Sequence, residues 1–320
     1  MSTRSLVFLG SAPFALPSLR LLVEGGIEVS AVITRPDRPS GRGKKLTPTP
    51  VKEAAMEHNV KIFQPENKQQ LLETLQQLKP QLLINVAYGM ILPDAVLALP
   101  PLKCLNLHPS LLPLYRGAAP IQRALMAGEP VTGVTVLFMT AKLDAGDIVL
   151  QEQVAIGPEE NFGALHDRLA DYGASLLFKA VNLQFQGKAT RTPQADQQAT
   201  FAPPLTREEE EINWSAPAVE IYNLVRALAP SPGAYTNFRG KRLKIWKAGL
   251  PQSPFELAGS GDALPNDKPG TICHVDPISL KVQCGKGALL LHEVQPESKR
   301  PMDARSFAGG YRLEVGEIIG

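Results

Sequence analysis

The chain has 320 residues and a formal net charge of only +2, so we expect two domains and local basic patches, not a uniformly basic surface, for any nucleic-acid partner. It contains three widely spaced cysteines without a C-x-x-C pair, five histidines without an H-x-x-x-H pair, and no run of about 18 apolar residues. These features argue against a disulfide framework, a dedicated zinc site and a membrane span, and predict a cytoplasmic protein.

The amino-terminal residues predict a β-α-β unit. Apolar runs at 6–9 and 29–33 are typical of strands, and 18–23 has helical spacing. The intervening GSAPFALPS has one glycine where G-x-G-x-x-G needs three, and its prolines oppose an early helix start. NAD and FAD are therefore not expected.

Residues 34–52 predict a long basic loop. Its single acid is Asp37, and it has no G-x-x-x-x-G-K-[ST] spacing, which argues against an NTP-binding loop. A solvated connector is the plain alternative, but connections in such units usually run about 2 to 6 residues. Contact with a phosphate backbone is the preferred hypothesis. The cations are Arg35, Arg38, Arg42, Lys44, Lys45 and Lys52.

Further alternation predicts an α/β fold with a mostly parallel sheet. Residues 51–58 and 69–78 have helical spacing, while 60–63 and 82–86 are strand-like. The segment AYGMILP follows the last of these strands, where Gly89 and its apolar neighbours could line a pocket at the carboxyl edge of the sheet. Plain core packing is the alternative for Ile91 and Leu92.

Chemistry is most concentrated in 104–120, CLNLHPSLLPLYRGAAP. If 104–107 is a buried strand, Asn106 and His108 leave its end on the same face. Three prolines stiffen the following turn, and Arg116 adds a charge. The alternative is that His108 is a structural histidine with its hydrogen bonds satisfied at a strand end and that Arg116 is a surface cation. Asp144 and Asp147 in KLDAGDIV supply carboxylates, so an imidazole, an amide and a carboxylate form a workable acyl-transfer set.

The first domain is expected to end with a helix that covers the sheet. Strands at 134–138 and 148–154 should pair across the KLDAG turn, after a short helix at 121–126. Residues 161–183 have apolar positions three and four apart, which predicts one long helix. Residues 186–207 are polar, contain proline and show no periodicity, so they predict a linker.

The carboxyl-terminal part predicts a small β-barrel with an RNA-binding face. A helix at 216–228 precedes β-like runs at 242–248, 271–275, 278–283 and 287–294. Segment 226–247 has six cations and no acid, interleaved with Tyr235, Phe238 and Trp246. Charge and stacking together suit RNA. An ordinary solvated strand face is the alternative.

Nearly the whole chain resembles the 10-formyltetrahydrofolate-dependent formyltransferases. CLNLHPSLLPLYRGAAPIQRALMAGE and LDAGDI carry the resemblance, and RGAAPIQRAL, VAYGMILP, INWSAPA and SPGAYT resemble the tRNA-acting branch. The resemblance implies a doubly wound, Rossmann-like catalytic domain at 1–189, a linker at 190–207, and an OB-like tRNA-binding domain at 208–320.

By motif position, the resemblance also implies roles for individual residues. Asn106, His108 and Asp144 would be catalytic, and no metal would take part. Folate contacts would come from Ala87, Tyr88, Gly89, Ile91, Leu92, Pro109, Ser110, Leu111, Leu112, Pro113 and Met139. Contacts to tRNA would come from Arg38, Arg42, Lys44, Lys45, Arg239, Lys241, Arg242 and Lys244.

The implied reaction moves the formyl group of 10-formyltetrahydrofolate to the α-amine of methionine on initiator tRNA, with the enzyme acting as a monomer. Alternatives within the family are formylation of glycinamide ribonucleotide or of a UDP-aminoarabinose, and hydrolysis of formylfolate. They share the amide, imidazole and carboxylate but need no tRNA surface. A non-catalytic RNA-binding protein is the alternative from another class.

Overall fold

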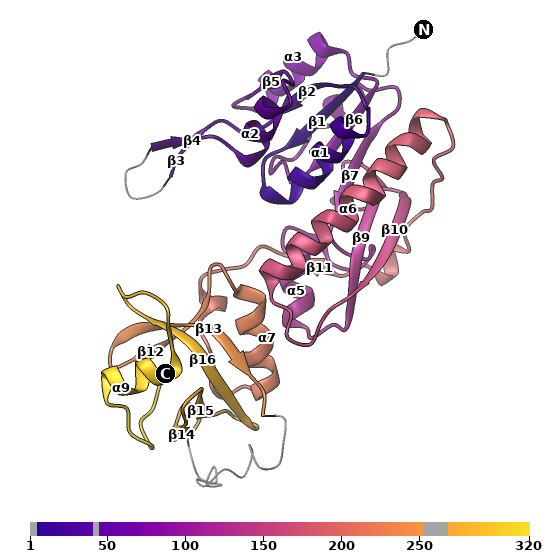
Figure 1. The fold of residues 1–320 in the computed structure, drawn as a ribbon. Helices are drawn as coiled ribbons and strands as arrows, with labels where there is room; N and C mark the ends of the chain where they lie inside the picture. Colours follow the sequence, from indigo (N-terminus) through magenta and orange to yellow (C-terminus); the bar gives the residue numbers. More distant parts are fainter. Residues whose placement is uncertain (1–4, 41–44, 252–267) are drawn as a thin grey trace. The chain divides into compact units, whose positions relative to one another are not determined.

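The computed structural model describes residues 5–40, 45–251 and 268–320, which form two compact units (Figure 1). Unit 1 comprises Met1–Pro120, Val131–Ala155 and His166–Ala202, and unit 2 comprises Ile121–Pro130, Ile156–Leu165 and Pro203–Gly320. The chain therefore passes between the units more than once. The sequence had suggested a single linker between two continuous domains.

Unit 1 is built on a seven-stranded sheet of order β10-β9-β7-β6-β1-β2-β5. The pairs from β7 to β5 are parallel, whereas β9 runs antiparallel to both β7 and β10. The predicted mostly parallel α/β class is confirmed. The strands are β1 (Leu6–Gly10), β2 (Val29–Ile33), β5 (Ile62–Phe63), β6 (Leu82–Val86), β7 (Cys104–His108), β9 (Val131–Phe138) and β10 (Ile148–Ala155).

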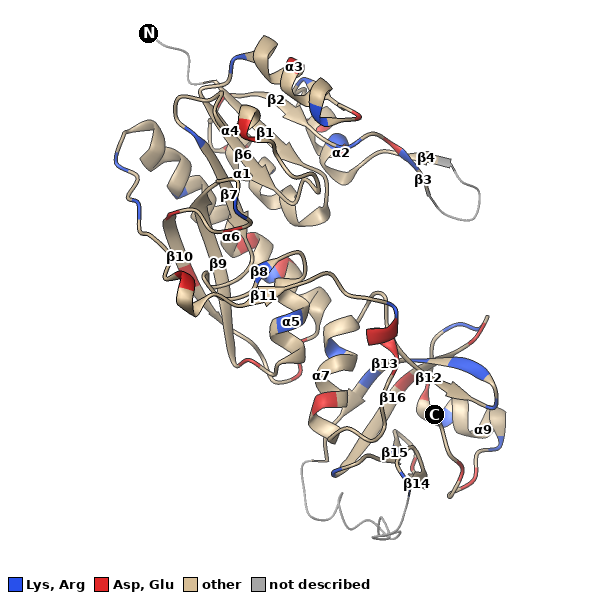
Figure 2. Cartoon of the chain, turned by 180° about the vertical axis from the view of Figure 1, so that it is seen from behind, with Lys and Arg blue, Asp and Glu red and all other residues tan. Residues whose placement is uncertain are grey.

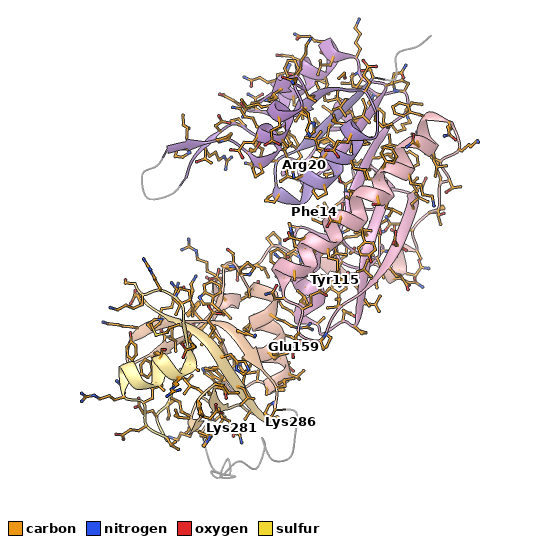
Figure 3. The ribbon with its side chains drawn as sticks, viewed as in Figure 1. Phe14, Arg20, Tyr115, Glu159, Lys281 and Lys286 are labelled. Atoms are coloured by element: carbon orange, nitrogen blue, oxygen red, sulfur yellow. The ribbon has the colours of Figure 1, made fainter. Side chains whose placement is uncertain are left out.

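Helices cover this sheet. Thr49 and Asn67 cap two of them by accepting backbone N–H bonds. The long helix α6 fits closely on β7, since a Cβ added at Gly173 would lie 2.7 Å from Leu107. Phe14, labelled in Figure 3, packs edge to face against the His166 ring, with 5.3 Å between the ring centroids. The helices are α1 (Leu16–Glu24), α2 (Pro50–Glu57), α3 (Lys68–Leu78), α4 (Asp94–Leu97) and α6 (Phe162–Phe185), with the 3-10 turn η1 (Pro13–Ala15).

Two stretches expected to be irregular carry structure. Within the basic loop, β3 (Arg38–Ser40) pairs antiparallel with β4 (Lys45–Thr47). Within the predicted linker, β11 (Phe201–Ala202) pairs in parallel with β8 (Arg116–Gly117), and Thr192 bridges to Ile148. The two pairings within the predicted linker join residues far apart in the sequence, and the local polar composition gave no sign of them. They hold residues 192–202 against the rest of unit 1.

Unit 2 is a smaller antiparallel sheet of order β12-β13-β16-β15-β14, with β17 on β16. Trp214, Phe238 and Phe307 are among the large side chains of its core. The predicted β-rich second domain is confirmed; β12, β17 and α9 had not been predicted. The elements are α5 (Pro120–Met126), α7 (Ala218–Leu228), β12 (Ala234–Phe238), β13 (Lys241–Gly249), β14 (Ile272–Val275), β15 (Leu280–Gln283), β16 (Ala288–Pro296), β17 (Met302–Asp303) and α9 (Ala304–Tyr311), with 3-10 turns η2 (Asp196–Gln198, in unit 1) and η3 (Glu208–Glu210).

Among the described residues, no helix is long and apolar enough to cross a membrane. The same residues include no group of three or more His, Cys, Asp or Glu side chains that could hold a metal ion.

Candidate active site

The tip of β7 presents the predicted amide and imidazole. Asn106 and His108 are two residues apart on a fully buried strand, so their side chains share one face. They are 7% and 4% exposed. Burial of two polar side chains at the carboxyl end of a parallel strand is costly unless both are hydrogen-bonded. The partners of these side chains therefore define the site.

The structure brings Asp144 to His108. The Asp144 Oδ2 atom lies 3.6 Å from His108 Nδ1 and accepts the Gly117 backbone N–H at 3.0 Å. The other ring nitrogen, Nε2, lies 2.9 Å from the carbonyl oxygen of Tyr115, a residue labelled in Figure 3. Both ring nitrogens thus face acceptor oxygens. A doubly protonated imidazolium would have an acceptor for each N–H.

Asn106 has a neighbour that was missed from the sequence. Asn85 on β6 is its register partner, and Asn85 Nδ2 donates to Asn106 Oδ1 at 2.6 Å. The bond occupies the Asn106 oxygen, and within the described part of the chain Asn106 Nδ2 has no hydrogen-bond partner, so it is available as a donor. Asn85 Oδ1 is buried without a hydrogen-bond partner among the described residues. In the sequence, the signal for Asn85 was a single amide side chain within the apolar run LLINV.

Arg116 is not the surface cation of the plain alternative. It is only 6% exposed. Its Nε and Nη2 atoms donate to Gln194 Oε1 at 3.1 and 2.8 Å, and Nη2 also contacts Asp196 Oδ1 at 2.7 Å. A buried guanidinium needs such partners. Arg116 therefore ties the 192–202 segment to the loop that follows His108.

The predicted folate residues differ in accessibility. Ser110 and Tyr88 are fully buried, and Ser110 Oγ donates to the Leu114 carbonyl, which gives it a structural role. The Tyr88 hydroxyl has no partner among the described residues, and burial raises the pKa of Tyr88 to about 12. Leu92 and Leu112 are buried; Ala87, Gly89 and Ile91 are exposed; Pro109, Leu111, Pro113 and Met139 are half-buried.

The basic stretch is only partly described. Arg38 is exposed on β3, whereas Arg42 and Lys44 lie outside the described residues, and Lys45 is described only as part of the β4 backbone. At its base, Lys52 Nζ donates to Asp37 Oδ2 at 2.6 Å. This bond lowers the pKa of the Asp37 carboxyl. One cation of the stretch is thus already paired.

Of the four predicted cations, Arg239 lies between β12 and β13, and Lys241, Arg242 and Lys244 lie on β13, where Figure 2 colours lysine and arginine blue; their surroundings differ. Arg239 makes two 2.8 Å bonds to the Glu317 carboxylate. Lys244 Nζ donates to the Pro232 carbonyl at 2.6 Å, and the Arg242 guanidinium stacks 3.9 Å from the Tyr235 ring centroid. Lys241 is exposed. Lys241 and Arg242 are therefore the cations best able to meet a polyanion.

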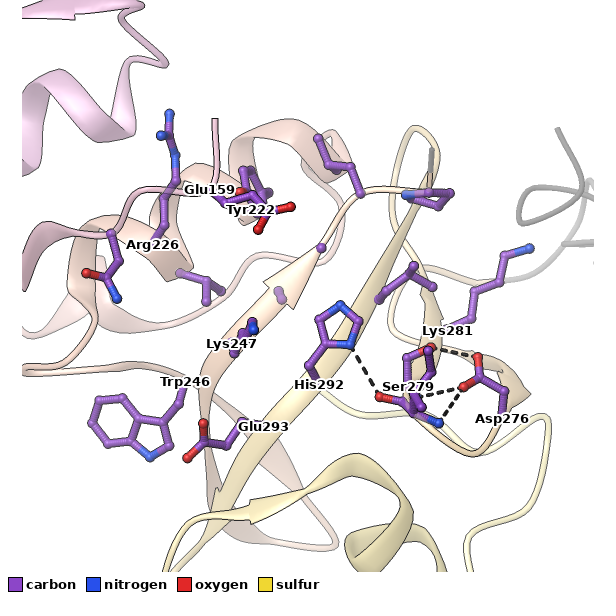
Figure 4. Close-up of a pocket in the computed structure, with 18 of the residues that line it drawn as sticks. Glu159, Tyr222, Arg226, Trp246, Lys247, Asp276, Ser279, Lys281, His292 and Glu293 are labelled. Atoms are coloured by element: carbon purple, nitrogen blue, oxygen red, sulfur yellow. Dashed lines mark hydrogen bonds between the residues drawn. The ribbon is translucent and has the colours of Figure 1, made fainter. Parts of the chain in front are cut away.

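A hollow of about 1050 Å³ lies wholly within unit 2 (Figure 4). Arg226, Trp246 and His292 are among its lining residues. The buried polar atoms without a partner in the described part of the chain belong to Ser18, Asn85 and Tyr88, and none of these lines it. Its geometry gives no sign of the acyl-transfer set, which resides in unit 1.

Comparisons with known proteins agree with this geometry. A model described as "Formyl transferase" matches residues 3–181, and one described as "Formyl transferase, C-terminal domain" matches 204–312. A methionyl-tRNA formyltransferase of Syntrophus aciditrophicus is 45% identical over 100% of both chains. One of Moorella thermoacetica is 48% identical over 98% of this chain and 99% of its own.

A solved structure supports the fold. HypX of Aquifex aeolicus in complex with tetrahydrofolic acid superposes with a TM-score of 0.64 at 18% identity. The match covers 99% of this chain and 49% of HypX, so the present chain spans about half the length of that protein.

Proposed function

The chain belongs to the formyl transferase family, and we propose that it transfers the formyl group of 10-formyltetrahydrofolate to the α-amino group of methionyl initiator tRNA. The product is formylmethionyl-tRNA for translation initiation. The proposal rests on the sequence identity of 45% to 48%, over nearly the full length of the chain, to relatives named methionyl-tRNA formyltransferase. The Asn106, His108 and Asp144 arrangement supports it chemically.

Formyl transfer requires stabilisation of a negative oxygen. The uncharged amine attacks the formyl carbon, a C–N bond forms, and the carbonyl oxygen becomes an oxyanion. The Asn106 Nδ2 donor and a protonated His108 would stabilise this charge, which exists only in the transition state. The bond to the folate nitrogen then breaks. In the overall balance, the proton lost by the amine ends on that nitrogen.

The surroundings of His108 suit this role. Asp144 Oδ2 at 3.6 Å supports a positive imidazole ring. His108 Nε2 now bonds to the Tyr115 carbonyl, so a substrate oxygen would share or replace that acceptor. The side chains of His108 and Asp144 are only 5% and 13% exposed. Because little water reaches these side chains, the attraction between Asp144 and His108 and the bond of His108 to an acceptor oxygen are both stronger than in bulk water.

The two substrates would use different surfaces. Folate would lie at the carboxyl edge of the sheet, where exposed Ala87, Gly89 and Ile91 adjoin β6. The tRNA would meet the basic stretch 34–52, Arg239 and the cations on β13. We further propose a monomeric, cytoplasmic enzyme.

A formylation assay tests the proposal. The protein is incubated with 10-formyltetrahydrofolate and methionyl initiator tRNA, and the amino acid is hydrolysed from the tRNA and identified. Formylmethionine is expected, and its absence would refute the function. Elongator methionyl-tRNA, glycinamide ribonucleotide and UDP-aminoarabinose serve as competing acceptors. Formate release without an acceptor would indicate a hydrolase. His108→Ala is the negative control, and we expect its rate of formyl transfer to be lower than the native rate by a factor of about 10² or more.

A further inference from the structure

A glutamine outside both family-model matches holds the turn that carries Asp144. Gln194 lies between residues 181 and 204, where those matches end and begin. Its Nε2 donates to the backbone carbonyls of Asp144 at 2.8 Å and Gly146 at 2.7 Å. Its Oε1 accepts the two bonds from Arg116. One side chain thus connects the catalytic turn to the loop that follows His108.

We propose that Gln194, held by Arg116, is a positioning residue for the formyl transfer. It acts on the turn 144–146 and keeps the Asp144 carboxylate beside His108. This inference rests on the proposed function for its kinetic consequences. The geometric consequence, the position of Asp144, is independent of that function.

The chemistry of the partners fixes the orientation of the Gln194 amide. A guanidinium can only donate hydrogen bonds and a backbone carbonyl can only accept them. The amide oxygen must therefore face Arg116, and the NH₂ group must face the two carbonyls. In this orientation both N–H groups and both lone pairs are used. A carboxylate at position 194 would satisfy Arg116 but would oppose the two carbonyl oxygens.

The turn needs external support. Asp144 has φ of 48°, in the left-handed region that residues with a Cβ seldom adopt. Gly146 has no space for a side chain, because an added Cβ would lie 1.7 Å from the Phe138 carbonyl oxygen. A strained backbone persists only where its surroundings determine it. The two bonds from Gln194 supply that constraint at both ends of the turn.

Gln194 is itself well anchored. The β11–β8 pairing and the Thr192–Ile148 bridge fix the segment on either side of it. Arg116, 6% exposed, fixes its amide oxygen. By contrast, the side chain of Asp196 is 64% exposed, and its pairing with Arg116 is at the surface. Asp196 therefore offers a control that accepts a hydrogen bond from Arg116 and, among the described residues, makes none with Gln194 or with residues 144–146.

The first test is kinetic. Gln194→Glu keeps the size of the side chain and its bonds to Arg116 but removes both donors to the turn. We expect kcat to fall at least tenfold, with KM for 10-formyltetrahydrofolate within about threefold of native. Asp196→Asn should stay within about threefold in both. In an Asp144→Asn background, Gln194→Glu should have little further effect, because the positioned group is already lost. Additive losses would overturn the inference.

The second test does not need activity. The Gly117 amide donates to Asp144 Oδ2, so its hydrogen exchange, followed by NMR, reports the position of that carboxylate. Gln194→Glu should accelerate this exchange at an unchanged melting temperature, while Asp196→Asn should not. Native-like exchange in Gln194→Glu would overturn the inference even if the native protein made no formylmethionine. The absence of formylmethionine would refute only the proposed function.

Discussion

Replacement of Asp144 by asparagine tests the electrostatic part of the mechanism. The Oδ2 atom lies 3.6 Å from His108 Nδ1. Two unit charges at that separation attract by about 4 to 5 kcal/mol at an effective dielectric constant of about 20. Asparagine keeps an oxygen for the Gly117 N–H and a dipole beside the ring, so we expect about half of this term to be lost. At 1.36 kcal/mol per tenfold, this corresponds to a kcat about 30- to 70-fold lower.

The assay is the initial rate of formylmethionyl-tRNA formation at saturating 10-formyltetrahydrofolate. Asp147→Asn is the matched control, because Asp147 lies in the same turn, its side chain is 38% exposed, and its carboxylate is 3.9 Å from the exposed Arg191 guanidinium. We expect that control to stay within about twofold of native. If Asp144→Asn folded normally and kept a kcat within threefold of native, the reasoning from charge at His108 would be wrong.

Three further predictions concern other parts of the molecule. Asn85→Asp presents only acceptor oxygens to Asn106, so the Asn106 amide should rotate and turn its Nδ2 away from the substrate. We expect kcat to fall about tenfold or more. A native kcat would show that Asn85 does not orient Asn106. Lys241→Gln or Arg242→Gln should reduce the slope of log affinity for tRNA against log salt by about 0.7 to 0.9. Arg239→Gln should change the slope less, because Glu317 already pairs with that cation; equal changes in the three variants would contradict this ranking. Burial raises the pKa of Tyr88 from 10.0 to about 12, so the folded protein retains a proton that the unfolded chain releases. The resulting stability is fully present below pH 10 and is lost as the pH rises toward 12. Denaturant unfolding should therefore show a smaller loss of stability over this range for Tyr88→Phe than for the native protein, and parallel losses would contradict the assignment.

The fold class was readable from the sequence because its signals are local. Apolar runs such as 6–9 and 82–86 and the apolar spacing of 161–183 follow the periods of strands and helices. Strand-end chemistry was also readable, since alternation alone places Asn106 and His108 on one face of β7. The second domain was predicted as β-rich from short apolar runs separated by glycine and proline. Short elements such as β12 and β17 lacked comparable signals.

Other features depend on residues far apart in the sequence. Asn85 and Asn106 meet only because β6 and β7 are neighbours in register. Arg116 was the residue hardest to interpret from the sequence, and its partners lie 78 and 80 positions away. A polar stretch such as 190–207 contains nothing in its composition that distinguishes a free linker from a segment held by distant partners.

The sequence by itself determined which chemical groups are available: an amide and an imidazole at a strand end, a carboxylate in a glycine-containing turn, and two basic stretches. Those properties follow from residue type and short-range periodicity. Only the tertiary structure decided how the groups are held: Asp144 lies 3.6 Å from His108, and Gln194 donates hydrogen bonds to the backbone of the turn that carries Asp144. The reason is physical: hydrogen bonds and ion pairs depend on distance in space, and the chain brings these residues together only when the sheet and its connections have formed.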